Sequence, residues 1–157
     1  MGVYERMARL GDRGFDRLRD KQAFKVDEAG AVDGDFSSLR GSPYALLVTF
    51  RRNREAMPTP VWLGVDDAGV AYVKTRRDAG KVKRLGHDGR ALLAPSNWRG
   101  RPTGPAIRGA GRVLQREEWD HAEATLAAAY GTTRAVFERA MGGPEELAAY
   151  IEIRPGR

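Results

Sequence analysis

Apolar and polar positions divide the chain into an N-terminal part with helical spacing and a middle part with the spacing of strands. Large apolar residues recur every three or four positions over 3–20, which predicts a helix, and the Gly- and Asp-rich segment 26–38 is expected to be a connecting loop. Pro58 and Pro60 cannot donate ladder hydrogen bonds, so their strand is expected at a sheet edge or with a bulge at its start. Strands are predicted at 44–50, 57–65, 70–75, 90–96, 106–114 and 147–154.

Helices are predicted between these strands. A short helix is expected at 78–85 and ends at Gly86. A longer helix at 117–130 carries an apolar face and ends at Gly131, after which a further helix continues to position 141. The order of about six strands with inserted helices predicts an α+β fold built on an antiparallel barrel.

The chain is expected to form one folded domain with an N-terminal extension. Its 157 residues suit a single compact domain. Residues 1–40 are predicted to be a helical and loop extension packed on this domain, and 41–157 the domain itself.

Composition excludes several kinds of site. The chain has no cysteine, so disulfides, thiolate metal sites and cysteine nucleophiles are excluded, and with two histidines no metal site is expected. No apolar run approaches the roughly 20 residues needed to cross a bilayer. The N-terminus mixes acidic residues with arginines and lacks the apolar middle of a signal peptide. We therefore expect a cytoplasmic protein without a membrane span.

The net charge of +6 permits nucleic acid, anionic lipid or an anionic small molecule as a partner. Arginines are dispersed along the whole chain, with few aromatic residues between them. This pattern favours a solvated basic surface, so any nucleic-acid binding is expected to be weak, nonspecific and sensitive to salt.

Side chains that catalyse reactions by themselves are scarce. The chain contains neither a Gly-x-Ser-x-Gly elbow nor a phosphate-binding P-loop motif. His87 is expected in a turn, and His121 on the exposed side of its helix. Asp66 and Asp67 are interpreted as turn formers. An enzyme built on such a sequence would take its chemistry from a cofactor.

The strongest candidate site follows the third predicted strand. Three of the five lysines, Lys74, Lys81 and Lys83, fall within ten positions around Thr75. A hydroxyl, two lysines and the start of a helix, where backbone N–H groups are unpaired, favour binding of a phosphate. The alternative is a loose capping box, Thr75-x-x-Asp78, with solvated lysines.

Five segments of the chain follow one another in a recognisable order. They are Tyr44 to Phe50, Pro60 to Gly64, Tyr72 to Thr75, Gly80 to Leu85 and Arg90 to Pro95. Together they resemble the pyridoxamine 5′-phosphate oxidase-like split-barrel superfamily. The resemblance covers about residues 40–115 and is closest to the flavin/deazaflavin oxidoreductase branch, which often uses the deazaflavin coenzyme F-420. It implies an antiparallel split β-barrel with flanking helices, paired as a homodimer.

The resemblance also implies a cofactor groove between two subunits. The phosphate-binding threonine and lysine of the family fall on Thr75 and Lys81, and Lys83 lies close enough to help. A strand backbone borders the flat ring, and Asn97 approaches the cofactor from the partner subunit. The oxidase proper carries an arginine beside the phosphate lysine, where this chain has Gly80. The implied cofactor-binding residues are Pro60, Val61, Trp62, Thr75, Lys81, Lys83 and Asn97.

The function implied by the resemblance is that of a coenzyme F-420-dependent oxidoreductase. Hydride passes between the reduced deazaflavin and a small organic substrate, and no catalytic side chain is implied. Trp62 can belong either to the core or to the border of this flat ligand. The alternatives are an FMN-binding oxidoreductase of the same fold and a non-catalytic protein that binds flavin, haem or a tetrapyrrole.

Overall fold

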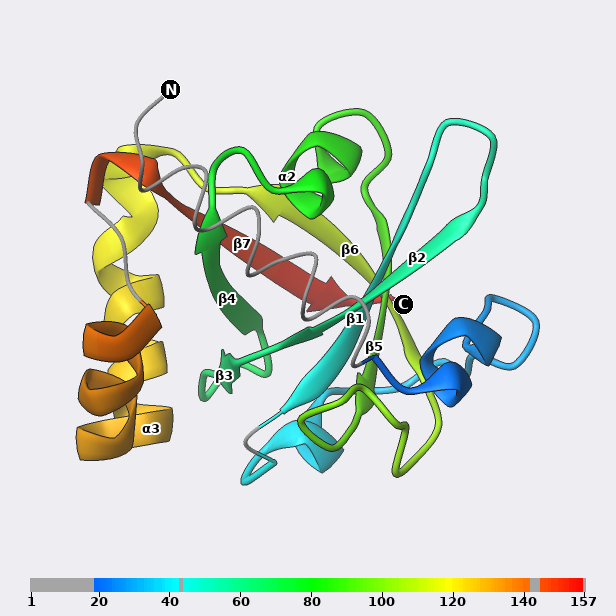
Figure 1. Ribbon diagram of the computed structural model, residues 1–157, viewed down its shortest axis with the longest axis horizontal. Helices are drawn as coiled ribbons and strands as arrows, with labels where there is room; N and C mark the ends of the chain where they lie inside the picture. The colour runs from blue at the N-terminus through cyan, green and yellow to red at the C-terminus, as the bar shows by residue number, and fades with distance from the viewer. Residues whose placement is uncertain (1–18, 43, 142–144, 157) are drawn as a thin grey trace.

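The structure, a computed structural model, describes residues 19–42, 44–141 and 145–156 (Figure 1). The helix predicted at 3–20 lies outside the described residues except for its last two positions. The strands are β1 (Ala45–Phe50), β2 (Ala56–Val61), β3 (Leu63–Val65), β4 (Ala71–Arg76), β5 (Arg90–Pro95), β6 (Ile107–Val113) and β7 (Ala148–Pro155). The helices are α2 (Gly80–Leu85) and α3 (Trp119–Met141), with short 3-10 helices η1 (Lys21–Lys25), η2 (Ser37–Leu39), η3 (Arg116–Glu118) and η4 (Glu145–Leu147).

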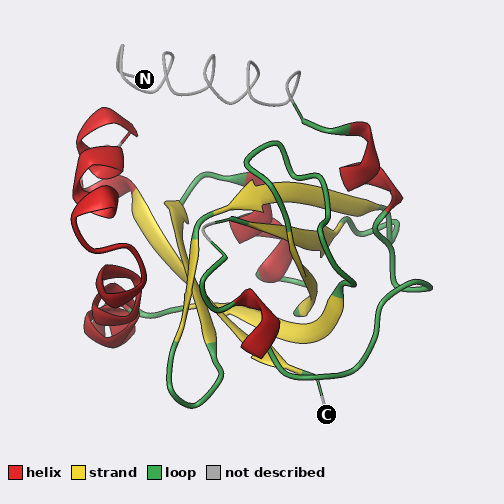
Figure 2. Cartoon of the chain, turned by 90° about the horizontal axis from the view of Figure 1, so that it is seen from below, coloured by secondary structure: helices red, strands yellow, loops and turns green. Residues whose placement is uncertain are grey.

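The seven strands form one antiparallel sheet in the order β2-β1-β5-β6-β7-β4-β3. Strands β2 and β3 therefore lie at opposite edges, although only Trp62 separates them in sequence. The sheet curls into a barrel so that one bent segment can occupy both edges (Figure 2). The prediction of one strand at 57–65 is wrong, because the segment forms two strands that are separated at Trp62. The edge position predicted for Pro58 and Pro60 is confirmed, because among the described strands β2 pairs with β1 alone.

Alternate residues of each strand point into the barrel or away from it. The interior is filled by aliphatic side chains such as Leu47, Val73 and Ile151, together with Phe36 from the segment before β1. On the outside, one cluster packs around Leu46 and Val48 of β1, and another packs between the sheet and α3.

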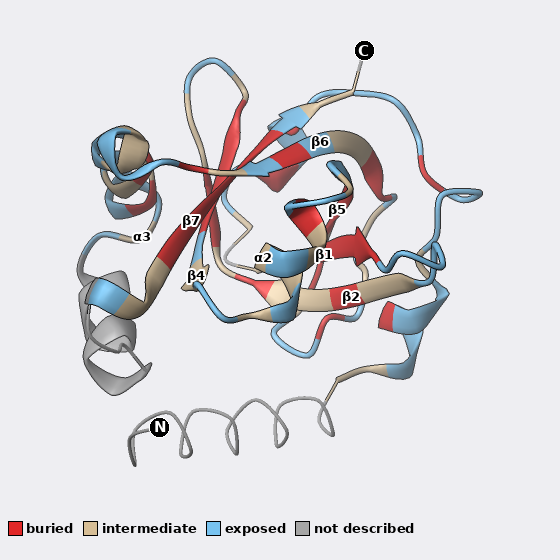
Figure 3. Ribbon diagram, turned by 90° about the horizontal axis from the view of Figure 1, so that it is seen from above, coloured by how far each residue is buried: buried red, intermediate tan, exposed pale blue. Residues whose placement is uncertain are grey.

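Helix α2 lies across one end of the barrel (Figure 3). Leu85 is buried in the barrel core, and Val82 packs against the same core. Helix α2 therefore covers this end of the barrel with its apolar side. Antiparallel pairing reverses direction at each step from β1 through β5, β6 and β7 to β4. Consequently β1 and β4 run the same way, and both end at the side of the barrel that α2 covers.

Helix α3 packs on the outer side of β3, β4 and β7, as the apolar face predicted for 117–130 indicated. Ala122 and Leu126 are buried in that contact. The helix is interrupted at Gly131, whose φ of 52° favours glycine, so the predicted end at this residue is confirmed. Among the described residues no helix has both the length and the apolar character needed to span a membrane.

Gly64 permits the close approach of α3 to β3. A β-carbon at this position would lie 2.9 Å from the carbonyl oxygen of Thr125 and 3.3 Å from Cα of Leu126. Both of these atoms belong to backbone, which cannot rotate away as a side chain can. The separation between β3 and α3 therefore depends on the absence of a side chain at position 64.

We expect Gly64→Ala to lower the free energy of unfolding by roughly 1–3 kcal/mol, because it overpacks this contact. Gly34→Ala is the matched control, since a β-carbon there would meet no atom within 4 Å. It should change the stability by less than about 0.5 kcal/mol. Urea denaturation of the two variants and the natural chain measures both effects. Equal stabilities would contradict the close contact between α3 and β3.

Candidate functional site

The turn between β4 and α2 brings together the residues expected to bind a phosphate. Thr75 lies near the end of β4, half-buried, on the same side of the strand as the core residue Val73. Lys81 is half-buried in the first turn of α2, and Lys83 is exposed on the same helix. Lys74 lies on the outer side of β4, with its Nζ 5.7 Å from the centre of the Tyr150 ring. Thr75, Lys81 and Lys83 therefore gather around one end of the barrel, whereas Lys74 lies on its outer side.

The capping box considered for this junction is absent. Helix α2 begins at Gly80 rather than at 78, and its N-cap is Ala79, which makes no side-chain capping hydrogen bond. Asp78 instead forms an ion pair with Arg76, with its Oδ2 2.6 Å from the arginine Nη2. Thr75 therefore does not serve as the helix cap.

The segment expected beside a flat ring forms the bend between β2 and β3. Val61 points inward and is buried in the barrel core. Trp62 is half-buried on the outer side, between two tyrosine rings. Its ring centre lies 5.7 Å from Tyr44, edge to face, and 4.7 Å from Tyr130. Trp62 thus belongs to an aromatic cluster at the bend, and its backbone interrupts the strand there.

Asn97 organises the loop between β5 and β6. Its side-chain oxygen accepts hydrogen bonds from the backbone N–H groups of Arg99, at 2.9 Å, and Arg101, at 3.0 Å. Gly100 of the same loop packs against Pro60, because a β-carbon there would lie 2.9 Å from the proline Cγ. The structure therefore brings the loop of Asn97 next to β2 within a single subunit.

Arg84 of α2 is a candidate binding residue that the sequence analysis missed. Its Nε donates a hydrogen bond of 2.7 Å to Oγ1 of Thr49, a fully buried residue near the end of β1. The guanidinium extends back along α2 to Gly80, where a β-carbon would lie only 2.6 Å from Nη1. The i, i+4 spacing of Gly80 and Arg84 on a helix was the available signal.

The electrostatic surroundings of Arg84 are positive. Burial, followed by the charges of Arg51 and Arg19, lowers the pKa of Arg84 below its ordinary value. The described residues place no carboxylate in an ion pair with this guanidinium. Arg84 thus adds a half-buried cation at the end of the barrel where Thr75 and Lys81 also lie.

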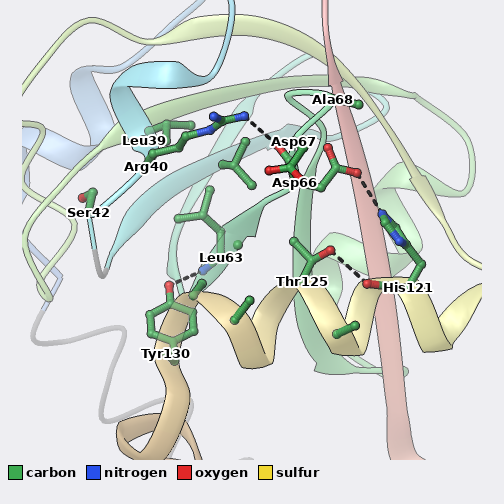
Figure 4. A pocket seen from close by; sticks show the side chains of 16 residues that line it. Leu39, Arg40, Ser42, Leu63, Asp66, Asp67, Ala68, His121, Thr125 and Tyr130 are labelled. Carbon is green, nitrogen blue, oxygen red and sulfur yellow. Dashed lines mark hydrogen bonds and ion pairs between the residues drawn. The ribbon is translucent and has the colours of Figure 1, made fainter.

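A separate cavity of about 790 Å³ lies between α3, β3, the β3–β4 turn and the segment after η2 (Figure 4). Its walls are mixed, with apolar side chains between polar groups from the segment after η2, the β3–β4 turn and α3. None of the predicted cofactor-binding residues lines it. Tyr130 borders this cavity, and its hydroxyl accepts a hydrogen bond of 2.7 Å from the backbone N–H of Leu63.

One polar group of the cavity is Asp66, in the β3–β4 turn. Its Oδ1 accepts a hydrogen bond from the backbone N–H of Val70, which confirms its predicted role in the turn. Its Oδ2 also lies 2.9 Å from Nε2 of His121, an interaction the sequence analysis missed. The His121 side chain is 64% exposed, as predicted. This pair joins the β3–β4 turn to α3.

Two pKa values at this contact are shifted. Burial opposes ionisation of Asp66, but hydrogen bonds from His121 and from the Val70 backbone prevail and lower the pKa of its carboxyl group. Tyr72 lies beside the pair, with its ring centre 5.3 Å from that of His121. Burial, together with the negative charges of Asp66 and Glu152, raises the pKa of Tyr72 to about 12.

Known structures share this fold at low sequence identity. A protein of unknown function from Agrobacterium tumefaciens aligns with a TM-score of 0.58 and 14% identity, covering 74% of this chain and 50% of that one, so this chain spans half its length. HutZ, a haem storage protein from Vibrio cholerae, aligns with a TM-score of 0.58 and 9% identity over 78% of this chain and 88% of its own. An F-420 reductase aligns with a TM-score of 0.51 and 15% identity over 81% of this chain and 97% of its own.

By sequence, no family model and no curated protein matches the chain. The structural alignments, at these identities, show a shared fold alone. The chain shares an α+β split-barrel fold with these proteins, so the fold that the sequence predicted is confirmed, while the pairing into a homodimer stays a prediction.

The raised pKa of Tyr72 predicts a loss of stability in alkali. The unfolded chain releases the phenolic proton near its ordinary value of 10.0, whereas the folded chain keeps it to about 12. The stability that the Tyr72 hydroxyl contributes is therefore fully present below pH 10.0, the pKa in the unfolded chain. It is lost as the pH rises through about 12, the pKa in the folded chain. Relative to Tyr72→Phe, the free energy of unfolding of the natural chain should fall by up to about 1.4 kcal/mol per pH unit in this window. Urea denaturation across the window measures the difference, and parallel pH profiles would contradict it.

Proposed function

We propose that the chain is an oxidoreductase that binds coenzyme F-420 at the β4–α2 junction. The observation that carries this proposal is the gathering of Thr75, Lys81 and Lys83 at the one end of the barrel that α2 covers. A hydroxyl donor and ammonium groups suit the oxygens of a phosphate. The net charge of +6 favours the approach of a polyanionic coenzyme.

The remaining proposed contacts lie at the bend and in the β5–β6 loop. The backbone of Pro60, Val61 and Trp62 borders the flat ring. Asn97 is proposed to approach the cofactor from the partner subunit through its amide nitrogen, because its side-chain oxygen already accepts two hydrogen bonds within its own loop.

The bound cofactor would supply hydride chemistry toward an electron-poor bond of a small organic substrate. The protein contributes position and a dry environment, because a hydride acceptor must lie close to the donor and in a defined orientation. We assign no catalytic side chain. Thr75 and Lys81 bind, the bend at Trp62 orients the ring, and the walls of the groove exclude water.

FMN in the same groove is the nearest alternative, and non-catalytic binding of a flavin, haem or tetrapyrrole is the next. The fold itself does not choose among them, since a haem storage protein and an F-420 reductase both share it. Equilibrium titration of the purified protein with F-420, FMN and haemin decides the cofactor. Tight haem binding without binding of either flavin would replace the proposed function by the non-catalytic alternative.

A homodimer is part of the proposal, because the groove is expected to form between two subunits. Trp98 of the β5–β6 loop is 50% exposed, and Phe24 of η1 is 57% exposed. These residues lie on neighbouring segments, since the backbone N–H of Asp20 donates to the carbonyl oxygen of Arg99 at 2.8 Å. We infer that this apolar surface beside β2 contacts a second copy of the chain.

We expect Lys81→Ala to weaken cofactor binding roughly tenfold to a hundredfold, because it removes a charge-assisted hydrogen bond worth about 1.5–3 kcal/mol. Thr75→Val should weaken binding less, since it removes only a neutral hydroxyl contact. Flavin fluorescence titration measures the affinities, and thermal unfolding shows that folding is unchanged.

Two controls test the cause of this loss. Lys25→Ala removes an exposed lysine from η1 and should leave the affinity unchanged. The phosphate-free form of the cofactor that the natural chain binds, the deazaflavin core for F-420 or riboflavin for FMN, should bind Lys81→Ala and the natural chain about equally. Equal losses of affinity for the phosphorylated and the phosphate-free form would show that Lys81 does not contact the phosphate.

The dimer should be observed at micromolar concentration by sedimentation velocity. Trp98→Glu is expected to raise its dissociation constant by roughly thirtyfold or more, since a buried aromatic residue at an interface contributes about 2 kcal/mol or more. Ala68→Glu, at an exposed residue of the β3–β4 turn, is the control for one added negative charge and should leave the dissociation constant unchanged. A natural chain that remains monomeric would contradict both the dimer and the groove built on it.

A further inference from the structure

The guanidinium of Arg84 is held in a fixed position by neutral groups. Thr49, which accepts the hydrogen bond from its Nε at 2.7 Å, is fully buried and fixed within β1. The Nη1 end lies against the backbone of Gly80. A half-buried cation is costly unless an anion balances it, and neither the hydroxyl nor the glycine provides one.

The charges near Arg84 increase this cost. Arg51 and Arg19 act on it with the same sign. Arg51 itself forms an ion pair with Glu55 at 3.1 Å, and both of those side chains are more than half exposed. Across residues 19–42, 44–141 and 145–156, no carboxylate pairs with Arg84. The arrangement therefore favours an anion that the protein itself does not supply.

We propose that Arg84 is a phosphate-binding residue whose Nη1 and Nη2 groups donate hydrogen bonds to phosphoryl oxygens of the cofactor. Because Thr49 fixes Nε, the other N–H groups form an oriented planar fork, which matches two phosphoryl oxygens better than a lysine does. That the phosphate belongs to a flavin-type cofactor rests on the proposed function. The preference for a phosphate rests on Arg84 and Thr49 alone.

Gly80 is required for this position of the guanidinium. A β-carbon at 80 would lie 2.6 Å from Nη1 and 3.4 Å from Cζ of Arg84, so the two groups cannot share the space. The atom in the way is the far end of a flexible side chain, which can move without disturbing the backbone. Alanine is also a better helix former than glycine. Gly80→Ala should therefore displace the charge of Arg84 without removing it or unfolding α2.

The test compares the natural chain with Arg84→Gln, Gly80→Ala and the double variant. Each is titrated at constant ionic strength with FMN and riboflavin, or with F-420 and its phosphate-free deazaflavin core, according to which the natural chain binds. Arg84→Gln should weaken binding of the phosphorylated form about tenfold to a hundredfold, and Gly80→Ala roughly threefold to tenfold. The phosphate-free form should bind all four proteins alike. Gly80→Ala should have no further effect once Arg84 is replaced.

A second measurement does not need a flavin. Inorganic phosphate should raise the Tm of the natural chain relative to chloride at equal ionic strength, because a ligand of the folded state stabilises it. If phosphate raises the Tm of the natural chain but not that of Arg84→Gln or Gly80→Ala, the role of Arg84 is supported. Should no flavin bind in that case, only the proposed function fails. Tight flavin binding that neither variant weakens overturns the role of Arg84 and leaves the proposed function standing. A natural chain whose Tm does not respond to phosphate, and whose affinity for the phosphorylated cofactor does not depend on Arg84, also overturns it.

Discussion

The bend at Trp62 is the constraint on which the rest of the structure depends. A single residue links strands at opposite edges of the sheet, so the sheet must curl until its edges approach each other. Tyr130 of α3 holds this bend, because its hydroxyl accepts the hydrogen bond from Leu63 and its ring packs against Trp62. The curl encloses the apolar core and leaves a barrel end that α2 covers.

Closure of the barrel also explains why the candidate site contains residues from distant parts of the chain. Strands β1 and β4 are not neighbours, yet both run toward α2, and Thr49 and Thr75 lie near their ends. Arg84 then connects α2 to β1 through Thr49. The oxidase pattern implied an arginine at position 80, whereas here a guanidinium reaches that residue from one helical turn further along.

Local patterns predicted most of the elements, because alternation, glycine positions and proline chemistry act over a few residues. The bend was not predicted, since residues on both sides of Trp62 favour a strand and position 62 itself carries no glycine, proline, asparagine or aspartate that would signal a turn. The contacts of Arg84 with Thr49 and of His121 with Asp66 join residues 35 and 55 positions apart. Such pairs exist only once the barrel has closed, and no local pattern records them. The predicted capping box is absent because α2 begins at Gly80 with Ala79 as its N-cap, so Thr75 and Asp78 do not occupy the N-cap and N3 positions.

The exclusion between a side chain at 80 and the guanidinium of Arg84 has an evolutionary consequence. A chain of this fold that acquires a larger residue at 80 displaces Arg84, and selection on position 84 is then relaxed. A chain that first loses Arg84 leaves position 80 free to change. The two positions should therefore vary together among relatives. Glycine at 80 together with arginine at 84 would mark one group of relatives. A bulkier residue at 80 without arginine at 84 would mark another.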